Sequence, residues 1–291
     1  MTLPPAVPEI ETRPITLFEP PSFGRLRPLA ELARLSRFTD LLFTLSVHRV
    51  KVRYKQSRLG VLWAIVQPLA MMLVFTLMFS FIGGAPTHAV PYAVFAYAAL
   101  LPWTAFSSGL STASGALTSH ATLLTKVAFP REILPITYVV AALVDLATAA
   151  TALAALMAWY HVPLTGTAAW SAVAIALLAL FLLAMGLLMS ALQVRYRDVG
   201  LALPVVLQVW LFATPVLYPL SAARHSLSPE IYALYVLNPM AGIVETFRRG
   251  VVLDHGPDPG ALLAATAVMA VALPAAYAYF KFAELTMADV V

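Results

Sequence analysis

The sequence contains no cysteine and few charged residues. Its 291 residues are 61% hydrophobic and 11% charged, whereas soluble domains have about 45–50% apolar and about 25% charged residues. The lack of cysteine excludes disulfides, thiolate metal sites and thiol nucleophiles. The shortage of charge excludes an ordinary soluble enzyme, a disordered chain and a nucleic-acid-binding surface, because too few polar side chains are present to cover a globule. The composition therefore predicts a membrane protein.

Motifs for nucleotides and metals are also missing. The sequence has no Gly-x-x-x-x-Gly-Lys-Ser/Thr phosphate loop and no His-Glu-x-x-His motif, and its six histidines lack metal-ligand spacing. A membrane-embedded glycosyl- or acyltransferase would need clustered acids or a His–Asp pair at a membrane face, and we find neither. We therefore expect no catalytic residue, no metal and no cofactor on this chain.

Long uncharged stretches set the number of membrane spans, because about 20 apolar residues cross roughly 30 Å of hydrocarbon. The 67 residues between Arg58 and Lys126 carry no charge and fit two spans. Residues 133–194 fit two more, and residues 199–217 and 261–280 fit one each. The prediction is an all-α polytopic membrane protein with six transmembrane helices.

Four regions follow from this count. Residues 1–27, which are rich in proline and lack an apolar core segment, are expected to be a disordered cytoplasmic extension. Residues 28–58 are expected to contain an amphipathic interface helix, residues 59–282 the six-span domain, and residues 283–291 a short cytoplasmic tail.

Basic residues set the predicted orientation. With both termini in the cytoplasm, 15 of the 18 Lys and Arg residues fall on the inner side, and only Arg224, Arg248 and Arg249 fall outside. The positive-inside rule therefore favours cytoplasmic termini.

A helix on the inner membrane surface is predicted before the first span. Its apolar stripe recurs at offsets 0, 3, 4, 7 and 14 and consists of Phe38, Leu41, Leu42, Leu45 and Val52. Five basic residues then follow within residues 49–58. These cations serve either as an anchor to anionic lipid or as a receiver for a phosphate-bearing substrate.

The second inner loop, residues 124–135, combines an aromatic side chain with charges and a proline. Its candidate residues are Lys126, Phe129, Pro130, Arg131 and Glu132. A plain turn needs no such set, whereas an apolar side chain with a charged rim suits docking to a cytoplasmic partner. We therefore predict a partner contact here.

About 40 residues separate the fifth and sixth spans, and they carry their own helix signals. Ser228-Pro229 and Asn238-Pro239 are helix starts, and Met240, Ile243, Val244 and Phe247 form an apolar stripe that ends at Gly250. Two short external helices are expected, either capping a pathway or resting on lipid.

Asp145 is the one carboxylate well inside a predicted span. Such residues serve as proton relays in some membrane proteins. A structural hydrogen bond to a neighbouring helix is an equal alternative, so both interpretations stay open here.

A series of short motifs resembles one family of membrane proteins. The longest is Lys-Val-Arg-Tyr-Lys-Gln-Ser-Arg-Leu-Gly-Val-Leu-Trp-Ala-Ile-Val-Gln-Pro-Leu at residues 51–69, and smaller motifs follow in order over about residues 36–282. They are Leu101-Pro-Trp103, Phe129-Pro-Arg131, Arg197-Asp198, Gln208-Val-Trp210, Thr214-Pro-Val216 and Leu237-Asn-Pro-Met240. The ordered set resembles the membrane subunit of bacterial ABC exporters for O-antigen, teichoic acid and capsule.

The resemblance implies a homodimer in the bacterial inner membrane that forms a polymer channel, with two separate ABC ATPase subunits that hold ATP and Mg²⁺. It implies a coupling helix at residues 126–132. It further implies an entrance for an undecaprenyl-diphosphate-linked polysaccharide at Arg53, Tyr54, Lys55 and Arg58. The implied outer gate comprises Asn238, Pro239, Met240, Phe247 and Arg248.

Aromatic side chains deep in two spans are candidates for the channel wall, because stacking would let a sugar polymer slide without tight binding sites. They are Trp103, Phe106, Trp210 and Phe212. Two alternatives remain: an ABC exporter of drugs or lipids, which would lack the Tyr-Lys-Gln-Ser-x-Leu-Gly entrance, and a proton-coupled transporter that uses Asp145.

Overall fold

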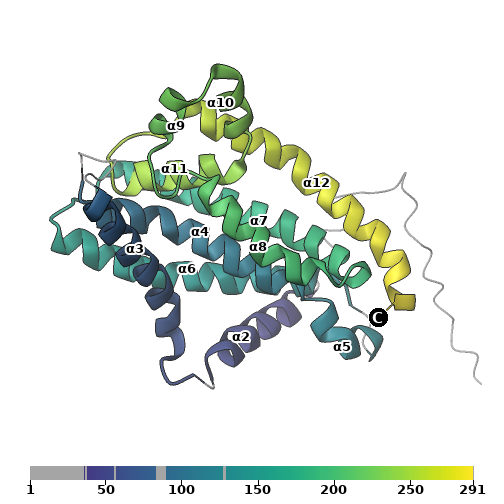
Figure 1. Cartoon of the computed structure of the whole chain (residues 1–291). Helices are drawn as coiled ribbons and strands as arrows, with labels where there is room; N and C mark the ends of the chain where they lie inside the picture. The colour runs from purple at the N-terminus through teal and green to yellow at the C-terminus, as the bar shows by residue number, and fades with distance from the viewer. Residues whose placement is uncertain (1–35, 37, 56, 83–89, 127–128, 291) are drawn as a thin grey trace, which may run out of the picture.

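The computed structural model describes residues 36, 38–55, 57–82, 90–126 and 129–290 (Figure 1). Every regular element in these ranges is a helix, which confirms the predicted all-α class. The α-helices are α2 (Thr39–Lys55), α3 (Trp63–Ile82), α4 (Tyr92–Ser114), α5 (Ala121–Lys126), α6 (Ile133–Trp159), α7 (Trp170–Arg195), α8 (Val199–Phe212), α9 (Leu220–Ser226), α10 (Pro229–Val236), α11 (Pro239–Val251) and α12 (Pro259–Val290). Short 3-10 turns lie at Gly60–Leu62, Thr118–His120 and Gly166–Ala169.

Five helices in the described ranges are long and apolar enough to cross a bilayer: α3, α4, α6, α7 and α12. The predicted fifth span, residues 199–217, is shorter than expected, because α8 ends at Phe212. Its 14 residues rise only about 21 Å at 1.5 Å per residue. Pro215 follows the end of α8 and has no N–H group for a continued helix.

Helix α4 lies at the centre of the bundle and contacts α3, α6, α7 and α11. In its most apolar stretch of 18 residues, 83% of the residues are buried. The helix is rich in alanine and serine and contains Gly109, and such small residues let neighbouring helices approach closely. At Gly109, an added Cβ would lie 2.7 Å from the Leu182 side chain of α7 and 2.9 Å from Ala142 of α6.

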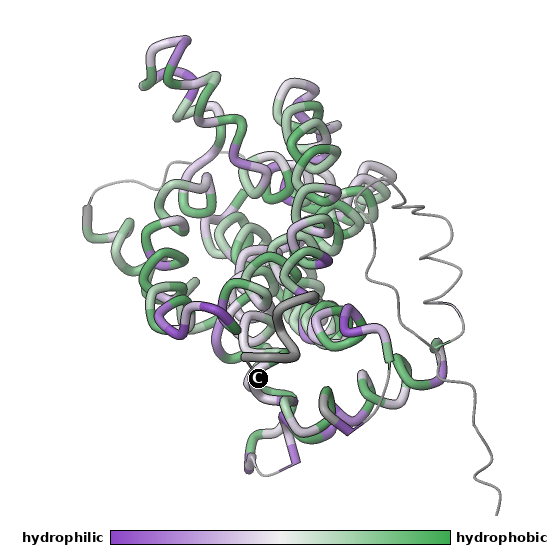
Figure 2. The backbone as a smooth tube through the Cα atoms, turned by 90° about the vertical axis from the view of Figure 1, so that its right-hand side faces the viewer, coloured by the Kyte–Doolittle hydropathy of each residue, from purple (hydrophilic) through white to green (hydrophobic). Residues whose placement is uncertain are grey.

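Helix α3, in contrast, is mostly exposed, because only 6% of the residues in its most apolar stretch of 18 are buried. Its outward side chains are large and apolar, and Phe81 is 87% exposed. Figure 2 shows hydrophobic residues along much of the long helices. An apolar surface of this kind suits acyl chains or another membrane-embedded subunit.

The two ends of the bundle differ. Helices α9 and α10 lie at the top of Figure 1, α2 and α5 lie at the bottom, and α12 runs from the α10 side toward the lower right. Helix α12 continues to Val290, so the predicted tail after residue 282 is helical. The predicted extension at residues 1–27 lies outside the described residues.

The predicted interface helix corresponds in part to α2, which packs against α6. Phe38, Leu41 and Leu45 of the predicted stripe are half-buried, whereas Val52 is exposed. Val52 lines a cavity on the α6 side of α2, together with Leu45. The end of the predicted stripe therefore faces α6 without being packed against it.

The short helices after α8 begin where the cap residues predicted. Ser228 caps α10 by accepting a hydrogen bond from the Ile231 N–H, and Asn238 caps α11 by accepting one from the Met240 N–H. Helix α9 was not predicted. Helix α11 is buried on nearly all sides against α4, α7 and α12, so it does not rest on lipid.

Helices α11 and α12 pack closely at Gly242, so a side chain at this position is expected to destabilise the protein. A methyl group at Gly242 would lie 2.9 Å from Ala265 Cβ and closer still to the backbone oxygen of Ala261. We expect Gly242→Ala to destabilise the protein by about 1–3 kcal/mol, because a backbone carbonyl cannot rotate away. Thermal unfolding in detergent measures the effect. Gly166→Ala is the control, since no atom lies within 4 Å of its added Cβ, and equal melting of the two variants would contradict the packing.

Candidate functional site

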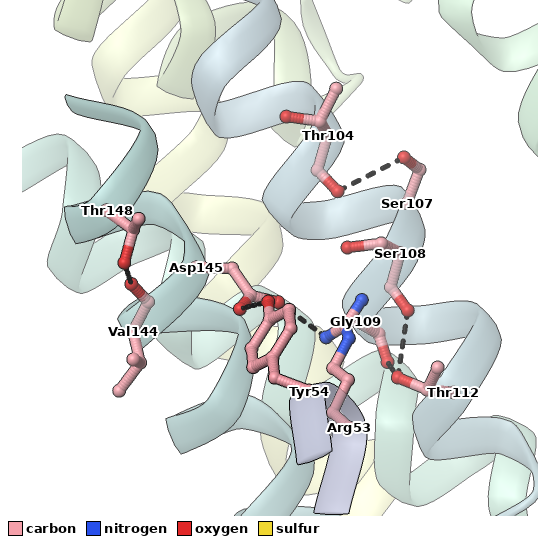
Figure 3. Close-up of polar contacts among 10 residues, drawn as sticks. All are labelled: Arg53, Tyr54, Thr104, Ser107, Ser108, Gly109, Thr112, Val144, Asp145 and Thr148. Atoms are coloured by element: carbon pink, nitrogen blue, oxygen red, sulfur yellow. Dashed lines mark hydrogen bonds and ion pairs between the residues drawn. The ribbon is translucent and has the colours of Figure 1, made fainter. Parts of the chain in front are cut away.

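The end of α2 is joined to the middle of α6 by a buried carboxylate (Figure 3). Arg53 Nη1 lies 2.5 Å from Asp145 Oδ2, and the Tyr54 hydroxyl donates a hydrogen bond to Asp145 Oδ1. Asp145 is only 8% exposed, so its charge needs these partners. Both carboxylate oxygens of Asp145 thus link α6 to α2. This arrangement corresponds to the structural hydrogen bond to a neighbouring helix that was one of the two interpretations of Asp145.

Tyr54 contributes a proton donor to this link. Burial, the hydrogen bond to Asp145 and the charge of Asp145 together raise the pKa of the Tyr54 hydroxyl above its ordinary value. The hydroxyl therefore remains protonated at neutral pH and keeps donating to the carboxylate.

A small cavity of about 70 Å³ lies beside the Arg53–Asp145 pair. Thr104 and Ser108 of α4 and Gln67 of α3 line it together with the pair. Figure 3 shows Thr104 and Ser108 on the same stretch of α4 beside the pair. The cavity is far smaller than the 300–1,000 Å³ typical of ligand pockets, so it is not a substrate site.

A second cavity of about 280 Å³ lies beneath α2 and is lined by basic side chains, among them His48, Arg49, Arg53 and His120. The Arg49 guanidinium lies 3.7 Å from the centre of the Tyr138 ring, and its Nη2 is 2.9 Å from His120 Nε2. Burial lowers the pKa of His120, with the positive charge of Arg49 acting in the same direction. His120 is therefore neutral at pH 7, and Nε2 accepts the hydrogen bond from Arg49.

The predicted entrance residues divide into two groups. Arg53 and Tyr54 are engaged with Asp145, whereas Lys55 and Arg58 are exposed. No salt bridge of Lys55 or Arg58 occurs among the described residues. Sequence reasoning missed Arg49 and His120 as partners, because 71 positions separate them and no motif links them.

The predicted partner-contact segment is split by residues 127–128, which lie outside the described residues. Lys126 ends α5 and is exposed. Phe129 is half-buried and packs on a cluster that contains Leu134, Tyr138 and Phe280, so it is less exposed than expected. Pro130 is buried, and Glu132 is only 2% exposed, so neither belongs to an exposed rim.

Glu132 and Arg131 are held by the end of α12. Glu132 forms an ion pair with Lys281 and accepts a hydrogen bond from the Tyr277 hydroxyl. Arg131 donates to the backbone oxygen of Glu284 at 3.2 Å. Lys281 also lies 3.1 Å from Glu284 Oε2. This network, which the sequence did not reveal, ties the segment after α5 to α12.

Three of the four predicted channel aromatics form one cluster. Phe106 lies 5.4 Å from Trp210 and 5.1 Å from Phe181 between ring centres, and Trp103 lies 6.4 Å from Trp210. Trp103 and Phe106 are buried inside the chain, and Trp210 is half-buried. Trp103 and Phe106 are therefore not on the surface of this chain, whereas Phe212 is 54% exposed.

Asn238 joins α8 to the start of α11. Its Oδ1 accepts hydrogen bonds from Trp210 Nε1 and from the Met240 N–H, both at 3.1 Å. Its Nδ2 donates to Thr214 Oγ1 at 3.0 Å and to the Ala213 oxygen at 3.2 Å. Asn238, which caps the start of α11, therefore also holds the end of α8 in place.

Arg248 of α11 is fully buried and organises the irregular segment after α8. Its guanidinium donates to the backbone oxygens of Pro215, Val216 and Tyr218 at 3.0–3.4 Å, and it pairs with Glu245. It also lies 4.0 Å from the centre of the Phe95 ring. The remaining predicted gate residues, Pro239, Met240 and Phe247, are buried in the same helix.

These features define a polytopic helical membrane protein with charged links at both ends of its bundle. A family model described as ABC-2 type transporter matches residues 40–252. The match covers most of the chain, so the chain belongs to the ABC-2 type transporter family and is a transport permease.

Named relatives are similar over most of their length. The O-antigen export system permease protein RfbA of Myxococcus xanthus is 32% identical over 248 residues, which are 85% of this chain and 94% of that protein. An RfbA permease of Klebsiella pneumoniae is 24% identical over 211 residues, 72% of this chain and 79% of that protein. The capsule polysaccharide export inner-membrane protein CtrC of Neisseria meningitidis serogroup B is 26% identical over 219 residues, 71% of this chain and 77% of that protein.

The Arg53–Asp145 link predicts an asymmetric mutational effect. Arg53→Gln leaves a buried carboxylate without its cation, whereas Asp145→Asn leaves an arginine that is partly exposed and able to hydrate. We expect Arg53→Gln to lower thermal stability more than Asp145→Asn, and the double variant to be more stable than the sum of the two losses implies, by about 1 kcal/mol or more. Lys51→Gln, on the exposed side of α2, is the control. Additive losses would contradict the link.

Proposed function

We propose that this chain is the transmembrane subunit of an ATP-driven exporter that moves a lipid-linked polysaccharide across the bacterial inner membrane. The observation that carries the proposal is the 32% identity to an O-antigen export permease over 94% of that protein's length. Relatives named for capsule and polysialic acid export support the same substrate class. They favour this class over drugs or simple lipids.

ATP hydrolysis belongs, in this proposal, to two separate partner subunits that bind ATP and Mg²⁺. The chain's own sequence supports this division because it has no phosphate-binding loop. Two copies of the chain form the channel, and the exposed apolar surfaces of α3 and α8 suit contact with lipid or with a second copy. Both termini lie in the cytoplasm, as the distribution of basic residues favours.

The substrate enters beside α2. Lys55 and Arg58 are exposed at the end of this helix and are available to a diphosphate. Arg53 instead holds α2 against α6 through Asp145. The pairing gives Asp145 a structural partner, which favours an ATP-driven exporter over a proton-coupled mechanism based on this residue.

The segment from Lys126 to Glu132 transmits movement from the ATPase. Its contacts with Lys281 and Glu284 connect it to α12, and α12 packs along α7 and against α11 at the other end. A displacement at the inner end therefore has a continuous helical route to α11 and Arg248. Phe212 is exposed and presents an aromatic surface to the polymer.

The coupling role predicts a specific uncoupling. Replacing both Phe129 and Arg131 with alanine removes the apolar contact on the Phe280 cluster and the link to Glu284. We expect ATP hydrolysis by the assembled complex to continue while polysaccharide export falls at least about fivefold. A fivefold change is the lower end of typical coupling between two sites in a protein. Export is measured as polymer appearing outside the inner membrane per ATP hydrolysed.

The matched control for this variant is the pair Tyr196→Ala and Arg197→Ala. These residues are also an aromatic and an arginine, and they are exposed between α7 and α8. Normal coupling in the control together with loss in the Phe129/Arg131 variant supports the assignment. Wild-type coupling in the Phe129/Arg131 variant would remove it.

The entrance role predicts a selective loss of substrate stimulation. In a Lys55→Gln/Arg58→Gln variant, we expect substrate-stimulated ATPase activity to fall more than basal activity, because two cations that pair with phosphate are lost. Arg53 is left intact, since its removal strands Asp145. An equal fall in both activities would instead favour an electrostatic anchor to lipid.

A further inference from the structure

A large cavity with both polar and apolar lining lies at the end of the bundle opposite α2 and α5. Its volume is about 740 Å³, within the range of ordinary ligand pockets. Three helices and the connection before α12 contribute to its wall, and the side chains with polar chemistry include Arg224 and His225 of α9, Tyr232 of α10, Glu245 and Arg249 of α11, and Asp258. Figure 1 shows α9 and α10 gathered beside α11 at this end.

The wall formed by the α11–α12 connection is held in place by several hydrogen bonds. Arg249 Nε donates to the Gly256 oxygen at 2.8 Å, and the His255 N–H donates to the Arg249 oxygen at 3.1 Å. Thr167 Oγ1 lies 2.9 Å from the Gly250 oxygen and 3.1 Å from Asp254 Oδ1, and its single hydroxyl hydrogen is shared between these two acceptors. The cavity is therefore formed before any ligand binds, which lowers the cost of binding.

The lining combines hydrogen-bond donors, acceptors and one aromatic ring. Arg224 and Arg249 are donors, and Glu245 and Asp258 carry acceptor oxygens. His225 Nδ1 donates to the Ser221 oxygen at 2.6 Å, which leaves Nε2 as an acceptor in the neutral ring.

The Tyr232 ring is half-buried and presents an apolar body with a polar tip. Burial and the carboxylate of Asp258 raise the pKa of Tyr232, so its hydroxyl stays protonated and remains a donor.

This combination favours a carbohydrate over other ligand classes. Sugar rings present neighbouring hydroxyls that donate and accept together, and a C–H face that packs on an aromatic ring. A phosphate would meet the carboxylates of Glu245 and Asp258 as well as the two arginines, and an acyl chain would have to desolvate these charged side chains. No metal-binding group of three His, Asp or Glu side chains occurs in the described part of the chain.

The cavity also adjoins the buried arginine described above. Glu245 lines the cavity and at the same time pairs with Arg248. An occupant that contacts Glu245 is therefore linked through Arg248 to residues 215–218, because Arg248 donates hydrogen bonds to their backbone oxygens.

We propose that this cavity binds a short segment of the exported polysaccharide on the outer face of the membrane, next to the channel exit. The inference rests on the proposed function for the identity of the polymer. It adds a second saccharide site, distinct from the entrance at α2, whose occupation is sensed by α11 through Glu245.

The experiment uses the full complex with its ATPase partner in detergent. Oligosaccharides released by mild acid from the source bacterium's surface polysaccharide are the probe, and saturation-transfer NMR and titration measure binding. We expect saturable binding by the wild type, at least about tenfold weaker binding after Tyr232→Ala, which is about 1.4 kcal/mol, and a smaller loss after Tyr232→Phe, which keeps the ring and removes only the hydroxyl donor. Tyr160→Ala, at the end of α6, is the control for a tyrosine outside the cavity.

Several outcomes would overturn the proposal: no saturable binding by the wild type, equal affinity after Tyr232→Ala, or displacement of the sugar by glycerol phosphate, which would indicate a lipid headgroup site. If Tyr232→Ala fails to fold, His225→Ala replaces it, because His225 is exposed. Polysaccharide export in cells is measured in parallel. Export without oligosaccharide binding rejects only the cavity, whereas absence of export rejects the proposed function.

Discussion

The buried guanidinium of Arg248 is the interaction on which the outer part of the structure depends. Helix α8 ends after 14 residues, and the backbone oxygens of Pro215, Val216 and Tyr218 then lie beyond any helix. Backbone groups at membrane depth need partners, because hydrocarbon supplies none. Arg248 supplies them, Glu245 balances its charge, and the Phe95 ring makes a cation–π contact with it. The Arg248 side chain thereby joins three parts of the chain: residues 215–218, helix α11 and the central helix α4.

The opposite end of the bundle follows the same principle with different residues. Arg53 and Asp145 attach α2 to α6, and Lys281 and Glu132 attach α12 to the segment after α5. In each case a charge in an apolar protein is retained where it joins two elements. Helix α12 touches both ends, since it packs against α11 at Gly242 and carries Lys281 near its other end. Helix α12 therefore links the two ends of the bundle.

Local patterns were predictable from the sequence, and long-range pairings were not. The starts of α10 and α11 followed from Ser228-Pro229 and Asn238-Pro239, because capping depends on neighbours in the chain. The partner of Asp145 did not follow, since 92 positions separate it from Arg53 and helices that are apolar on all sides give no rotational signal. For the same reason Phe106 could be placed in a span but not assigned to the interior of the chain. The early end of α8 was missed because the apolar run continues past the helix.

The most direct test of the account is to solubilise the tagged chain gently from its native membrane and identify by mass spectrometry what co-purifies in comparable amount. The account predicts a soluble subunit with a Gly-x-x-x-x-Gly-Lys-Ser/Thr phosphate loop at a one-to-one ratio to this chain. Recovery of the chain alone, as a stable dimer without an ATPase, would contradict it.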